Sequence, residues 1–89
     1  MQRQTVTICN KLGMHARAAA KFVQLASGLD CEIKVARGGR EVNGKSIMGV
    51  MMLAAGPGTV IEIIASGTDE DKAVQDLTRL VQDRFGEGE

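Results

Sequence analysis

The chain has 89 residues, of which 44% are hydrophobic, and its 11 Lys and Arg side chains balance 11 Asp and Glu. This length suits one domain with a single core and is too short for a second, so we expect residues 1–89 to act as one module. Zero net charge and only two aromatic residues, both Phe, provide neither the basic field nor the stacking surface that nucleic-acid binding requires.

The first half of the chain predicts a strand, a helix and a hairpin. Residues 5–9 alternate polar and apolar side chains, which is typical of a half-buried strand, and a helix is expected over residues 16–27, ending at Gly28. Strands at 32–36 and 40–43 flank Gly38-Gly39, a pair suited to a tight hairpin turn. The side chains expected to point into the core are Val6, Ile8, Ala19, Phe22, Val23, Ala26, Ile33, Val35 and Val42.

The second half predicts a short helix, a strand and a longer helix. Residues 46–53 form an apolar segment with Ser46 placed as its N-cap, and residues 59–65 are the most β-prone run, so we expect a central strand there. Thr68 and Asp71 have the spacing of a capping box for a final helix that frays into residues 86–89. The residues that this helix is expected to bury are Ala73, Val74, Leu77, Leu80 and Val81.

The predicted element order is βαββαβα. Amphipathic helices and alternating strands indicate an α+β protein with an antiparallel sheet, covered by helices on one face and solvated on the other. No apolar run is long enough to span a membrane, and Met1 precedes polar residues rather than a signal peptide. We therefore expect a cytoplasmic protein. One His and two distant Cys residues provide no metal site, and no cofactor is expected.

The sequence contains one histidine, His15, at the point where a loop becomes a helix. The free N–H groups of residues such as Ala16 and Ala18, together with the helix dipole, favour an anion there, and Arg17 adds a planar cationic phosphate ligand. A neutral imidazole can attack a phosphoryl group without a separate base. The alternatives are a surface histidine that happens to precede a helix and a solvated Arg17.

Residues 39–46 match the nucleotide-binding pattern G-x-x-x-x-G-K-S. A true P-loop follows a buried parallel strand and is itself an open loop that binds an anion. Here the four intervening residues are predicted to be a strand, and no apolar strand ends in an Asp that could hold magnesium. We therefore reject nucleotide binding at this segment.

Two segments carry a family resemblance. Residues 12–19 resemble the active-site motif of HPr, the histidine phosphocarrier of the phosphoenolpyruvate-dependent sugar phosphotransferase system, and residues 45–53 resemble the second signature of that family. The resemblance covers essentially the whole chain and implies an open-faced β-sandwich, with a four-stranded antiparallel sheet and three helices. One position departs from the pattern, because the family usually has proline where this chain has Ala18.

The resemblance implies that Nδ1 of His15 accepts a phosphoryl group from enzyme I and passes it to A-type enzyme II components, or to partners in a nitrogen-regulatory branch. The protein would then be a covalent carrier, expected as a monomer, and no independent catalyst. The resemblance also implies that an HPr kinase/phosphorylase phosphorylates Ser46, whereas the sequence by itself indicates only an N-cap. A different possibility is a regulatory binding module controlled by Ser46, with His15 idle.

Methionines are frequent around these motifs. They can be read as core residues, but Met is also typical of surfaces that bind several partners. We expect an exposed docking patch beside His15, because a carrier must bind its donor and its acceptors on one face. The patch is predicted to comprise Met14, Ile47, Met48 and Met51.

Overall fold

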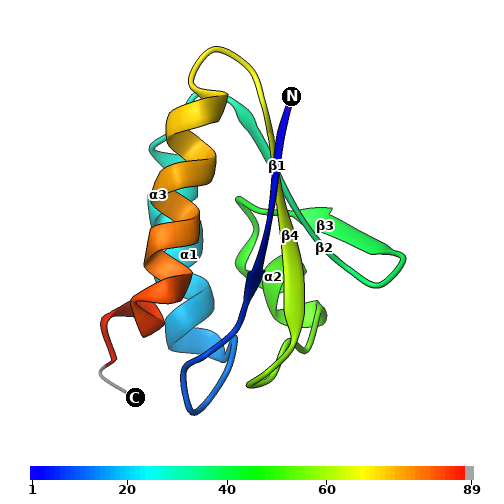
Figure 1. Ribbon diagram of the computed structural model, residues 1–89, viewed down its shortest axis with the longest axis vertical. Helices are drawn as coiled ribbons and strands as arrows, with labels where there is room; N and C mark the ends of the chain where they lie inside the picture. Colours follow the sequence, from blue (N-terminus) through cyan, green and yellow to red (C-terminus); the bar gives the residue numbers. More distant parts are fainter. Residues whose placement is uncertain (88–89) are drawn as a thin grey trace.

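The computed structural model describes residues 1–87 and places four strands in one antiparallel sheet. The order along the sheet is β1-β4-β2-β3, and three α-helices accompany it (Figure 1). The predicted βαββαβα order and α+β class are confirmed. The strands and helices, with a terminal 3₁₀ turn η1, are β1 Gln2–Thr7, α1 Ala16–Ser27, β2 Glu32–Arg37, β3 Arg40–Asn43, α2 Ile47–Met52, β4 Val60–Ser66, α3 Glu70–Gln82 and η1 Arg84–Gly86.

The sheet has the hairpin and the central strand that were predicted. β2 and β3 pair with Val35 opposite Val42, and Gly38 in the turn has the left-handed φ of 61°. β4 lies between β1 and β2, with Ile61 and Ile63 buried. Because β3 occupies the four residues inside the G-x-x-x-x-G-K-S match, this segment has no open phosphate-binding loop, as expected.

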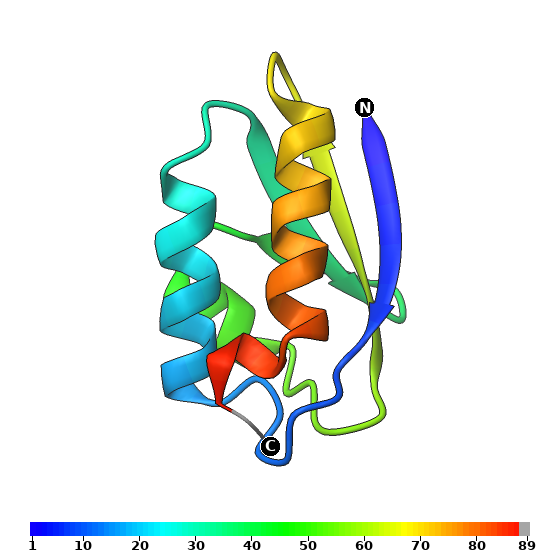
Figure 2. The same cartoon turned by 60° about the vertical axis from the view of Figure 1, so that its left-hand side comes forward.

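Helices α1 and α3 lie side by side on one face of the sheet, and α2 packs against α1 and β3 on the same side (Figure 2). The core between these layers includes Phe22, Leu77 and Phe85, all fully buried. Every predicted core residue is buried except Val42 and Leu80, which are partly buried and pack against the core.

Three local predictions were wrong. β1 begins at Gln2 rather than Thr5, although Val6 and Ile8 are buried as expected. Helix α3 is capped at Asp69, not Thr68, and no capping-box hydrogen bond forms at Asp69. The Asp69 carboxylate instead accepts the N–H groups of Asp30 and Cys31, both at 3.0 Å, so it secures the loop before β2.

The third error concerns the end of the chain. Residue 86 lies in η1 and does not belong to a frayed helix end, because the preceding Phe85 is fully buried and holds the turn against the core. Residues 88–89 lie outside the part of the chain that the structure describes. The turn brings Glu87 back to the start of α1, where His15 lies.

Candidate phosphoryl-transfer site

His15 is the N-cap residue of α1, as the sequence predicted. Its backbone is extended, with φ −81° and ψ −178°, and its Nδ1 accepts the N–H of Arg17 at 3.3 Å. The helical hydrogen bonds of α1 begin with the Ala19 N–H, which donates to the His15 carbonyl at 2.8 Å. The imidazole Nδ1 therefore lies at the positive end of the helix, where an anion is stabilised.

The loop before His15 is fixed by a glycine and by α2. Gly13 has a left-handed φ of 69°, and a Cβ there would lie 2.7 Å from the Ala55 carbonyl oxygen. The next residue, Met14, donates its N–H to that same oxygen at 2.8 Å. Backbone contact with the segment after α2 thus fixes the path of the loop that leads into α1 at His15.

The predicted phosphate ligands all lie in the first turn of α1, directly after His15. The N–H groups of Ala16 and Ala18 have no hydrogen-bond partner within residues 1–87, and the Arg17 guanidinium is exposed and likewise unpaired in this part of the chain. Ala18 itself is fully buried. An incoming phosphoryl group would therefore meet free backbone donors and one free guanidinium.

A pocket of about 330 Å³ lies beside this helix end. Sequence reasoning found Arg17 but not the other polar residues there, because their positions depend on the fold. Two further cations bring positive charge to the pocket, and Lys21 is held in place by donating to the Phe85 carbonyl at 2.7 Å. The lining residues are Lys11, Leu12, Arg17, Lys21, Gly86 and Glu87.

Glu87 contacts the other nitrogen of the ring, with 2.6 Å between Glu87 Oε2 and His15 Nε2. Asn10, which is fully buried, donates to the second oxygen of this carboxylate at 2.9 Å. The pKa of Glu87 is held below its usual range, first by the hydrogen bond from Asn10 and then by His15 and the charge of Lys21. No motif in the sequence pointed to Glu87 or Asn10.

The expected docking patch is only partly present. Ile47, Met48 and Met51 are exposed by 44%, 74% and 41%, but Met14 is 5% exposed and belongs to the core. The prediction that Met14 is exposed was wrong, because the turn at Gly13 directs this side chain inward. Leu12 and Met52, two apolar residues that the prediction omitted, are also exposed.

Ser46 is the N-cap of α2, as predicted, and its Oγ accepts the N–H of Gly49 at 3.1 Å. The side chain is partly exposed. The preceding Lys45 extends to the far end of α1, where its ammonium group donates to the Leu29 carbonyl at 2.6 Å. Ser46 therefore has a structural role that is independent of any modification.

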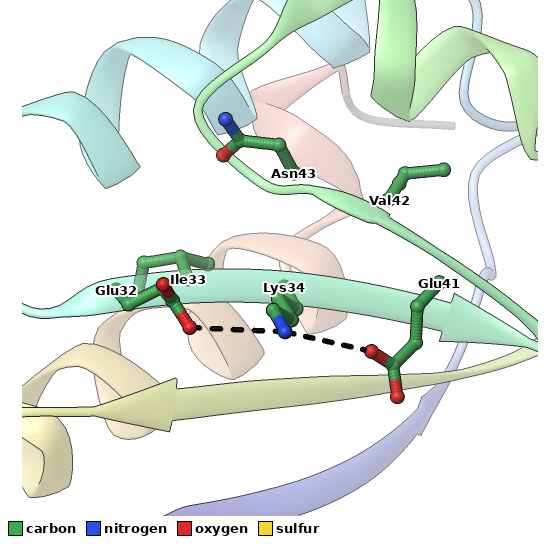
Figure 3. A pocket seen from close by; sticks show the side chains of 6 residues that line it. All are labelled: Glu32, Ile33, Lys34, Glu41, Val42 and Asn43. Atoms are coloured by element: carbon green, nitrogen blue, oxygen red, sulfur yellow. Dashed lines mark ion pairs between the residues drawn. The ribbon is translucent and has the colours of Figure 1, made fainter.

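A second hollow, of about 290 Å³, lies over β2 and β3 (Figure 3). Lys34 stands there between Glu32 and Glu41, with its Nζ 3.8 Å from an oxygen of each. One positive and two negative charges leave this cluster with a net negative charge, and exposed pairs of this kind contribute little to stability. Lys34, the cation that lines this hollow, is paired, whereas the Arg17 guanidinium beside His15 has no partner within residues 1–87.

Residues 2–83 match the family model described as "PTS HPr component phosphorylation site". The chain belongs to the HPr family. This family comprises phosphocarriers of the phosphotransferase system, which agrees with a histidine placed at the N-terminus of a helix. Within residues 1–87, no helix has the length and apolar character needed to cross a membrane.

Known HPr-family proteins are similar to the chain over nearly its whole length. Phosphocarrier protein HPr of Cupriavidus necator is 54% identical over 89 residues, covering 100% of this chain and 99% of that protein. Phosphocarrier protein NPr of Shewanella violacea is 44% identical, covering 98% and 94%. The crystal structure of HPr-C-His from Thermoanaerobacter tengcongensis superposes with a TM-score of 0.94 at 45% identity, covering 98% of each chain.

Proposed function

We propose that the protein accepts a phosphoryl group on Nδ1 of His15 from phosphorylated enzyme I and passes it to A-type enzyme II components in the cytoplasm. The observation that carries this proposal is the placement of Nδ1 at the N-terminus of α1, 3.3 Å from the Arg17 N–H. Unpaired backbone N–H groups in the first turn of α1 and the Arg17 guanidinium would stabilise a dianion, and a loose transition state needs little beyond positioning and charge neutralisation.

Partner docking is assigned to the apolar surface of α2. Ile47, Met48 and Met51 are exposed on a helix that packs against α1, so a partner bound there also covers the helix end that carries His15. Flexible methionine side chains adapt to surfaces of different shape. One monomer would thereby serve a donor and several acceptors in turn.

Regulation is assigned to Ser46, with HPr kinase/phosphorylase as the modifying enzyme. Its partly exposed hydroxyl lies next to Ile47 at the start of the docking helix. A phosphate there would be favoured by the N–H groups of α2 and would bring about two negative charges to an apolar docking surface. Partner binding should weaken, since a dianion loses hydration when a protein covers it.

Phosphoenolpyruvate and purified enzyme I provide the direct test. The protein should acquire one acid-labile, base-stable phosphate, and His15→Ala should acquire none while retaining the circular dichroism spectrum of the wild type. His15 is only partly buried, with 28% of its side chain exposed, so its removal should leave the fold intact. A labelled His15→Ala protein would refute the assignment.

The similarity to NPr of Shewanella violacea favours a second candidate, a carrier that serves nitrogen-regulatory partners. Incubation of the phosphorylated protein with A-type components of the sugar and nitrogen branches would distinguish the two. Faster transfer to the nitrogen-branch component would identify that branch as the physiological one. A regulatory protein controlled only by Ser46 would transfer to neither.

A further inference from the structure

The C-terminal segment is held in an unusual backbone conformation. Arg84, Phe85 and Gly86 have successive φ values of 55°, 53° and 74°, although residues other than glycine rarely occupy the left-handed region. Burial of Phe85 and the hydrogen bond from Lys21 to its carbonyl hold this turn in place. Such a conformation persists only where its surroundings fix it, and it often occurs at functional sites. Here this turn places the Glu87 carboxylate against the His15 ring.

The Glu87 carboxylate is also fixed from its other side. The Nδ2 of buried Asn10 donates to the Gly13 carbonyl at 2.8 Å and to Glu87 Oε1 at 2.9 Å. Both partners are acceptors only, so the amide nitrogen of Asn10, not its oxygen, must face Glu87. The second carboxylate oxygen then points to His15 Nε2, 2.6 Å away, with 12% of the Glu87 side chain exposed.

These contacts determine where the neutral imidazole carries its hydrogen. Nδ1 accepts the N–H of Arg17, so it presents a lone pair. Nε2 therefore carries the hydrogen and donates it to Glu87. This is the ring form in which Nδ1 can act as the nucleophile.

We propose that Glu87 is a positioning residue for phosphoryl transfer, which holds the ring hydrogen on Nε2 and offsets the positive charge of the ring once Nδ1 is bonded to phosphorus. The inference rests on the proposed function and assigns a role to a residue that no motif indicated. A carboxylate hydrogen-bonded to the far nitrogen of a reacting imidazole has both effects in the catalytic triads of hydrolases.

The transfer step balances without any proton loss. The Nδ1 lone pair forms the bond to phosphorus, while the bond between phosphorus and the donor breaks and its electron pair leaves with the donor. The hydrogen on Nε2 stays in place, so the ring becomes cationic and faces the Glu87 carboxylate. On transfer to an acceptor, the electron pair of the N–P bond returns to Nδ1, and the neutral ring is restored.

Glutamine at position 87 is the informative substitution. Because Asn10 presents N–H to this side chain, Gln must turn its oxygen to Asn10 and its NH₂ group to His15 Nε2. Two donors would then meet unless the ring hydrogen moved to Nδ1. A hydrogen on Nδ1 would in turn face the Arg17 N–H, so in Glu87→Gln each ring form has one unfavourable contact, and the Nε2–H fraction should fall well below that of the wild type. Glu87→Ala removes only the acceptor of the Nε2 hydrogen, so its Nε2–H fraction should fall less.

The experiment compares four proteins labelled with ¹⁵N-histidine by NMR at pH 9. These are the wild type, Glu87→Ala, Glu87→Gln and the control Glu41→Gln, in which the substituted carboxylate pairs with Lys34 on the sheet. The Nε2–H form should predominate in the wild type and the control, and it should decrease in Glu87→Ala and further in Glu87→Gln. The rate of phosphoryl acceptance from enzyme I should fall in proportion to the Nε2–H fraction, so a fraction of about one molecule in ten would slow acceptance about tenfold.

An unchanged Nε2–H fraction in either Glu87 variant would overturn the inference, as would a shifted fraction with an unchanged rate of phosphoryl acceptance. Circular dichroism and urea unfolding show whether a variant has lost its fold. Loss of the fold would change the NMR signals of the whole protein, not only those of the His15 ring. Failure of enzyme I to label the wild type would refute the proposed function. The ring-form measurement requires no transfer and would still decide whether Glu87 controls the imidazole.

Discussion

Replacing Gly13 by Ala tests whether the loop before His15 is set by backbone contact. The new Cβ would lie 2.7 Å from the Ala55 carbonyl oxygen and 2.8 Å from the Gly56 Cα, at a backbone φ of 69°. Two costs are expected. The left-handed conformation costs about 1–2 kcal/mol for a residue with a Cβ, and overlap with packed atoms costs about 1–3 kcal/mol.

Gly38→Ala provides a matched control. Gly38 has a similar φ of 61°, but a Cβ there would have no neighbouring atom within 4 Å. This variant should lose only the conformational contribution, about 1–2 kcal/mol, while Gly13→Ala should lose about 2–5 kcal/mol when both costs add. Urea unfolding followed by circular dichroism suits a chain without Trp or Tyr.

Gly13→Ala should also slow phosphoryl acceptance under conditions where it is still folded, because His15 lies two residues further on. Gly38→Ala should accept phosphate at the wild-type rate, since the hairpin turn is remote from α1. Equal losses of stability in the two variants would refute the reasoning. Equal losses would show that the Ala55 backbone moves away from the new Cβ at little cost, and that this contact does not fix the loop before α1.

Four other substitutions test separate parts of the structure. Arg17→Glu should slow phosphoryl transfer strongly, because it places a like charge beside the phosphate, and unchanged transfer kinetics would make Arg17 a bystander. Ala18→Pro should be tolerated and stabilise by roughly 0.4–1 kcal/mol through the unfolded chain, since the Ala18 N–H has no partner within residues 1–87; a clear loss in urea unfolding would contradict this. Ser46→Asp should leave the melting temperature unchanged or slightly higher while reducing the rate of labelling by enzyme I, and lower stability with normal labelling would leave only a capping role. Asp69→Asn tests a carboxyl whose pKa is lowered, first by the hydrogen bond with the Cys31 thiol. Because the folded pKa lies below the unfolded one, the stabilising effect of Asp69 is complete above the unfolded value of about 4 and is lost as pH falls through the folded value. The wild type should therefore exceed Asp69→Asn in stability at pH 6 and lose this advantage in strong acid, and a constant difference would refute the linkage.

The hairpin and the cap at Ser46 could be predicted because their signals are local. The pairing of Val35 with Val42 follows from alternation around two glycines, and Ser46 immediately precedes an apolar helical run. The burial of Met14 could not be predicted in this way. Its direction depends on the left-handed turn at Gly13 and on a hydrogen bond to Ala55, which lies far along the chain.

Glu87 shows the same limit for the candidate site. Periodicity identified the last helix, but the glycine-rich end carries no pattern. The contact with His15 spans 72 positions and depends on burial of Phe85, which lies at the end of the predicted helix but beyond the observed one. The histidine and its helix end were therefore predictable, whereas the groups that orient its ring required the tertiary structure.

The position of β1 beside β4 has a consequence for the time at which the protein becomes competent. The first strand synthesised, residues 2–7, pairs with residues 60–65, nearly the last part of the sheet to be translated. At about 5–20 residues per second, β1 waits roughly 3–10 s for its partner, and loop closure over such a distance slows folding further. His15 leaves the ribosome early, but the carbonyl of Ala55 and the carboxylate of Glu87 that position it are synthesised much later. Under the proposed function, a nascent chain shorter than 87 residues would lack the groups that position His15, so it would not compete with folded molecules for the donor.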